Sequence, residues 1–95
     1  MSHLYTIICE YAGGTYISQV NASSPENAVW SWLGTRASKK VIPKEPRERI
    51  KEGLDDDTPI AIRGCRNVWC FSASSKKGLV LINLIRTSLS QGQPS

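Results

Sequence analysis

The side chains of this chain that could do chemistry are few and lie far apart in the sequence. Three cysteines and a single histidine are the candidate metal ligands and nucleophiles, namely Cys9, Cys65, Cys70 and His3. Cys65 and Cys70 lack the tight pairing typical of zinc ligands, and no second pair completes a tetrahedral set. A reactive thiol needs an adjacent base, which His3 at the start of the chain does not offer to Cys65. We therefore predict no metal site, no cofactor and no catalytic residue, and a protein that is not an enzyme.

A run of three aspartates, Asp55, Asp56 and Asp57, is the densest acidic feature. Calcium-binding loops alternate their acidic ligands with other residues, and this run does not. We expect these residues to form an exposed turn before the next strand.

Basic residues crowd into one segment, with seven basic and three acidic residues between positions 35 and 52. Clustered Lys and Arg neutralise phosphates, so this segment, residues 36–51, is a candidate nucleic-acid site. The residues assigned to it are Arg36, Lys39, Lys40, Lys44 and Arg47. The alternative is a solvated basic loop, because the glutamates dilute its charge and a net charge of +4 is also what keeps a small domain soluble.

Two β-hairpins are predicted, one near each end of the chain. Residues 4–10 and 15–22 are rich in β-branched and aromatic residues, and the Ala-Gly-Gly turn between them suits a tight hairpin. Residues 67–87 repeat the pattern as two apolar runs around a Ser-Ser-Lys-Lys-Gly turn. Another strand is expected at residues 59–63.

Helix signals occupy the middle of the chain. Ser24 can cap a helix whose first position is Pro25, or Ser23 can form a capping box with Glu26. The helix should run to about Leu33, with Gly34 as a left-handed terminator. A short second helix can begin at Pro46 and end at residue 53.

These elements predict an α+β fold in the order β-β-α-(α)-β-β-β, with an antiparallel five-stranded sheet and the helices on one face. We expect one domain over residues 1–95, with a disordered tail at residues 88–95. No apolar run approaches 18 residues, and no leader is evident, so we expect a cytoplasmic protein that does not engage membranes. The odd number of cysteines agrees with reduced thiols.

The strands at both ends of the chain are apolar on both faces. One or two helices cannot cover both sides of five strands, so either the sheet curls over itself or a partner covers its second face. The predicted core combines apolar character with strand or helix periodicity and consists of Ile7, Cys9, Val20, Val29, Trp32, Leu33, Val68, Cys70, Leu81 and Leu84.

This excess of apolar surface predicts a non-enzymatic interaction domain that forms a homodimer or binds a small partner protein. Trp30 lies off the apolar stripe of its helix, and we assign it with Trp69 to the interface, because tryptophan is enriched among interface anchors. The alternative function is nucleic-acid binding through residues 36–51.

Three runs in the first third of the chain resemble the opening of HicB-type antitoxin domains. They are Tyr5-Thr-Ile-Ile-Cys-Glu10, Gly14-Thr-Tyr-Ile-Ser-Gln-Val20 and Ser24-Pro-Glu-Asn-Ala-Val29. In that family the β-β-α opening belongs to a partly degraded nuclease-like fold that binds a partner. The resemblance implies partner binding and transfers no residue roles.

Overall fold

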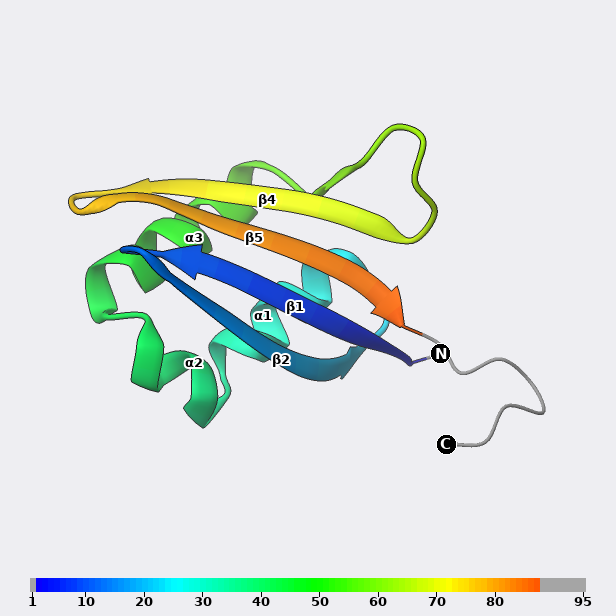
Figure 1. The fold of residues 1–95 in the computed structure, drawn as a ribbon, viewed down its shortest axis with the longest axis horizontal. Helices are drawn as coiled ribbons and strands as arrows, with labels where there is room; N and C mark the ends of the chain where they lie inside the picture. Colours follow the sequence, from blue (N-terminus) through cyan, green and yellow to red (C-terminus); the bar gives the residue numbers. More distant parts are fainter. Residues whose placement is uncertain (1, 88–95) are drawn as a thin grey trace.

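A computed structural model describes residues 2–87 of the chain. The predicted disordered tail, residues 88–95, lies outside the described residues. Within residues 2–87 the chain forms five strands and three helices, and Figure 1 shows the helices gathered on one side of the sheet. The predicted α+β class and the placement of the helices are confirmed.

The sheet is antiparallel, and its strands lie in the order β2-β1-β5-β4-β3. The strands are β1 (His3–Tyr11), β2 (Gly14–Ala22), β3 (Ile60–Ala61), β4 (Val68–Ser75) and β5 (Gly78–Thr87). The first and last strands, β1 and β5, pair at the centre and join the two hairpins into one sheet (Figure 1). The strand expected at residues 59–63 is shorter than predicted, since β3 pairs with β4 over two residues only.

The first hairpin turns on Ala12 and Gly13, whose φ angles are +51° and +82°. Two consecutive positive φ values are what a two-residue turn needs to match the twist of its strands. Gly13 adopts this conformation without strain, and Ala12 bears the cost of a side chain there.

Helix α1 (Pro25–Leu33) begins at the first of the two predicted starts, with Ser24 as its cap. The hydroxyl of Ser24 accepts a hydrogen bond from the backbone N–H of Asn27, and Pro25 occupies the first turn, where no N–H is needed. The prediction for Gly34 was wrong, because its φ of −81° is right-handed. The chain leaves α1 instead through Thr35, whose side chain donates a hydrogen bond to the carbonyl of Trp32.

The basic segment folds into two helices, α2 (Arg36–Val41) and α3 (Lys44–Asp56), rather than a loop and one short helix. Pro43 separates them and serves as the N-cap of α3. Gly53 does not end α3, which continues through Asp55 and Asp56, so the expected acidic turn is wrong for these two residues. The ring of Phe71 on β4 lies against Gly53, and this contact supports a helix that local signals would have ended.

The core lies between the sheet and the helices. Seven of the ten predicted core residues are buried, and the exceptions, Val68, Cys70 and Leu81, are half-buried. Strand side chains alternate, so Leu81 and Leu84 cannot share a face. The register pairs Val68 with Ile85 and Cys70 with Asn83, which places these residues on the side away from the helices. The core-facing residues of β4 and β5 are Trp69, Phe71, Ala73, Val80, Ile82 and Leu84.

Candidate interaction surfaces

The sheet face opposite the helices has no covering layer among residues 2–87, and we call it the bare face. Strand alternation and the pairing register assign its members. Its apolar side chains are Leu4, Ile8, Ile17, Ile60, Val68, Cys70, Leu79, Leu81 and Ile85.

Exposure on the bare face is greatest at its margins. Ile60 is 72% exposed, Ile17 68% and Leu79 57%, while the apolar residues between them are half-buried. One cross-strand row passes through all five strands, in the order Ile17, Ile8, Asn83, Cys70 and Ile60. The bare face is therefore continuous from one edge of the sheet to the other.

Charge is nearly absent from the bare face. Among the strand residues that point to this side in the described structure, Glu10 is the single carboxylic acid, and none is basic. Near one end, the hydroxyls of Thr6 and Thr87 lie 2.6 Å apart, and the amide of Gln19 donates to Thr6 at 3.0 Å. These polar groups thus satisfy one another across three strands. Further polar side chains lie between the apolar residues of the face, namely Glu10, Thr15, Asn21, Ser72, Ser74 and Asn83.

The outer edge of β2 is a second open feature. This strand forms the sheet margin and contains no charged residue and no proline. Edge strands usually carry such residues, which discourage pairing with another chain.

The two tryptophans assigned to an interface lie away from the bare face. Trp30 projects from α1 and is 37% exposed. Trp69 pairs with Leu84 on the helix side of β4, and its ring centroid lies 5.9 Å from that of Tyr5. An interface made by the bare face would contain neither of them.

The five residues assigned to nucleic-acid binding all lie in α2 and α3 or at their starts. Lys44 is 3.9 Å from Glu48, and Arg49 bridges Glu45 and Glu52 at 3.1 and 2.6 Å. Every glutamate of these helices is therefore paired with Lys44 or Arg49.

The remaining cations of the segment are unpaired. Arg36, Lys39, Lys40 and Lys51 are exposed, and within residues 2–87 they form no ion pair.

Arg47 has a different environment. Its guanidinium donates hydrogen bonds to the carbonyl of Leu33 at the end of α1 and, at 3.0 Å, to the hydroxyl of Ser38 in α2. Ser38 is fully buried and also donates to the carbonyl of Thr35. Arg47 therefore joins the three helices, which limits what its guanidinium can offer a ligand.

A shallow depression of about 260 Å³ brings Trp30 and part of the basic segment together. Its lining consists of Trp30, Leu33, Gly34, Lys39, Arg47 and Lys51. Lys39 and Arg47 were assigned to nucleic-acid binding. Trp30 was assigned to the protein interface and was also one of the aromatic residues expected to stack bases if exposed beside the basic segment. Lys51 was not assigned, although its place in the basic segment was a usable signal.

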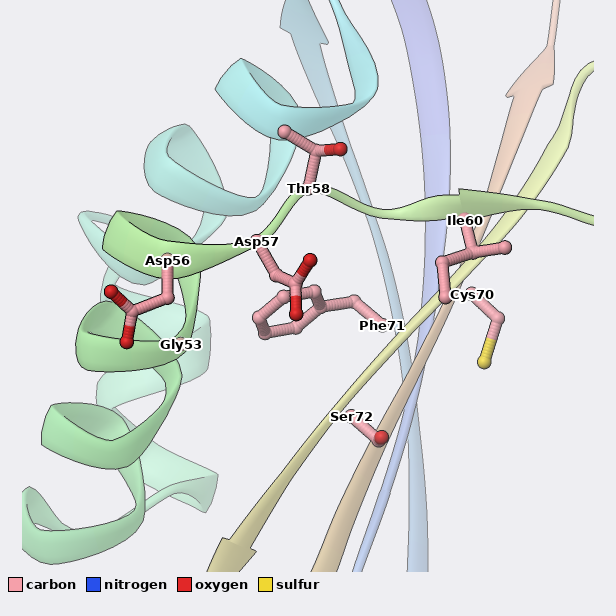
Figure 2. A pocket seen from close by; sticks show the side chains of 8 residues that line it. All are labelled: Gly53, Asp56, Asp57, Thr58, Ile60, Cys70, Phe71 and Ser72. Atoms are coloured by element: carbon pink, nitrogen blue, oxygen red, sulfur yellow. The ribbon is translucent and has the colours of Figure 1, made fainter.

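A depression of about 400 Å³ lies between the end of α3 and β4. Figure 2 shows the Asp57 side chain beside the Phe71 ring, while the Cys70 side chain points away from α3. Within residues 2–87, no group of three or more His, Cys, Asp or Glu side chains is arranged so that it could hold a metal ion.

None of the helices in that range is long and apolar enough to cross a bilayer.

The cysteines occupy three environments. Cys9 is fully buried, Cys70 half-buried and Cys65 exposed. Burial raises the pKa of the Cys9 thiol to about 11, with a further contribution from the neighbouring Glu10 carboxylate. Cys9 is thus a protonated core residue at neutral pH rather than a nucleophile.

Compared with known proteins, the chain matches no family model, no curated protein and no solved structure. The resemblance to HicB-type antitoxin domains stays a prediction. The bare face and the depression beside Trp30 are the features from which a function can be argued.

Proposed function

We propose that this protein is a non-enzymatic, cytoplasmic interaction domain that forms a homodimer by packing bare face on bare face. The observation that carries the proposal is the cross-strand row from Ile17 to Ile60 on an uncovered sheet, which is apolar at every position except Asn83. Burying apolar surface yields about 25 cal/mol per Å², so covering such a face stabilises an assembly considerably.

The size of the bare face suits a dimer. Four of its strands have eight to ten residues. At the usual strand spacing and rise they span about 20 by 30 Å, or about 600 Å² per copy. Two copies would bury about 1,200 Å², which lies at the lower end of the range for specific protein interfaces.

Charge and symmetry favour a second copy as the occupant. The net charge of +4 is carried almost entirely by surfaces other than the bare face, so two such faces can meet without like charges between them. In a two-fold dimer one patch serves both subunits. Asn83 lies at the middle of the row, and its amide, which both donates and accepts hydrogen bonds, can pair with the same group of the second copy.

Sedimentation at micromolar concentration tests the proposal. We expect a mass near twice the 10.5 kDa of one chain. Ile17→Lys places a charge on the bare face and should shift the protein to monomer.

The matched control is Tyr16→Lys, which places the same charge one residue earlier on β2 but on the helix side of the strand. A face-to-face dimer tolerates Tyr16→Lys and loses association with Ile17→Lys. Equal loss in both variants would instead indicate edge pairing through β2. A monomeric wild-type protein at all concentrations would overturn self-association.

A further inference from the structure

Trp30 and the unpaired cations of the basic segment occupy the helix layer, opposite the bare face. Trp30 is 37% exposed beside Lys39 and Lys51 in one shallow depression. An exposed aromatic side chain next to cations offers a flat surface for a base and positive charge for phosphates.

The arrangement of ion pairs concentrates positive charge at this place. The three glutamates of α3 interact with Lys44 and Arg49. Arg36, Lys39 and Lys40 have the spacing of one face of α2, where no acidic residue intervenes. The positive charge beside Trp30 therefore comes from α2 and Lys51, while the acidic residues of α3 still lower the net charge of the segment.

We propose that the depression formed by Trp30, Lys39 and Lys51 binds single-stranded nucleic acid. Trp30 stacks on one base, Lys39 and Lys51 contact the adjoining phosphates, and Arg36 and Lys40 continue the phosphate track along α2. Arg47 acts as a positioning residue, because its bonds to Leu33 and Ser38 hold α1, α2 and α3 together around the depression.

Single strands fit this site better than duplexes. Stacking on a tryptophan requires an unpaired base with an open face, which a duplex does not present. The site lies on the side of the sheet away from the bare face, so it does not depend on self-association.

Fluorescence polarisation with labelled dT and rU oligonucleotides, compared with a duplex of equal length, tests the proposal at several salt concentrations. We expect the single strands to bind more tightly. Trp30→Leu keeps the apolar bulk but removes the aromatic face, and it should weaken binding between about fivefold and a hundredfold. Trp30→Phe should retain most of the affinity.

The double variant Lys39→Gln/Lys51→Gln should lower the salt slope by about 1.4, the value for two lost single-strand phosphate contacts. Its charge-matched control is Lys76→Gln/Lys77→Gln in the β4–β5 turn, which should leave binding nearly unchanged. Circular dichroism melting confirms that each variant is folded.

The proposal is overturned by any of three results. These are no binding of wild-type protein at low salt, equal binding by Trp30→Leu, or equal weakening by the control double variant. The last two would describe a general polyanion surface. Sedimentation of Ile17→Lys with oligonucleotide separates the two proposals, since a monomer that still binds retains the site without the dimer.

Discussion

Arg47 on α3 donates a hydrogen bond at 3.0 Å to the hydroxyl of Ser38, the one polar residue among the fully buried side chains of residues 2–87. The same guanidinium reaches the carbonyl of Leu33 at the end of α1. One side chain thus satisfies groups from two other helices. A residue that the sequence had assigned to ligand binding is part of the structural framework.

Replacing Arg47 with Met keeps the aliphatic stem and removes both hydrogen bonds. We expect the free energy of unfolding to fall by about 1–3 kcal/mol, because buried acceptors lose their donor. Arg47→Lys should not restore it, since an ammonium lacks the two-pronged geometry. Urea denaturation measures the loss. Arg49→Met is the control, and its exposed ion pairs should contribute less than about 1 kcal/mol. Equal losses in both variants would contradict the structural role of Arg47.

Leu84 and Leu81 lie on opposite faces of β5. Leu84 is fully buried, so Leu84→Ala should lower the free energy of unfolding by about 2–5 kcal/mol. Leu81 is half-buried on the bare face, and Leu81→Ala should cost less than half as much in a dilute monomer. Chemical denaturation at two protein concentrations checks both values, and a Leu81→Ala loss that grows with concentration would indicate association through this face.

Gly53→Ala tests the contact that supports the last turn of α3. In an open helix interior this change adds about 1 kcal/mol of stability. Here the added Cβ would lie 3.0 Å from the Phe71 ring, so we expect the overpacking cost to cancel or exceed the gain. Thermal melts in wild-type and Phe71→Leu backgrounds provide the comparison, with Gly53→Ala becoming stabilising only in the latter. A gain of about 1 kcal/mol in the wild-type background would contradict this, because it would show that the Phe71 ring moves aside without an energetic cost.

Alkaline pH should destabilise the fold through Cys9. The folded-state pKa of this thiol is about 11, above its ordinary value of 9.0, so the unfolded chain releases its proton first. The contribution of this thiol to the free energy of unfolding should therefore be constant below about pH 9. It should fall between about pH 9 and 11, by at most about 1.4 kcal/mol per pH unit. Burial also raises the pKa of Tyr5, which acts in the same direction.

Cys9→Ala isolates the contribution of the thiol to this pH dependence. The variant should be less stable overall, but its stability should decline less steeply between pH 9 and 11 in urea titrations at several pH values. An unchanged slope would assign the alkaline loss to other groups.

Local signals in the sequence predicted much of this fold. Ser24 and Pro25 start α1 because capping involves only neighbouring residues. The turn at Ala12 and Gly13 forms because two residues suffice to reverse the chain. The excess of apolar residues over what one helix layer can cover was also visible, because it follows from strand alternation and composition.

The tertiary structure decided what depends on residues far apart in the chain. The pairing of β1 with β5 placed Leu84 in the core and Leu81 on the bare face. Strand alternation alone does not decide this, because a shift of one residue in the register exchanges the two faces. The Phe71 ring lies against Gly53, where α3 continues beyond the stop predicted from sequence, and the position of Leu33 and Ser38 gave Arg47 its partners. The sequence by itself determined which residues are apolar and where the chain turns. Only packing between distant segments determined which side chains are covered, because burial depends on the neighbours that the fold supplies.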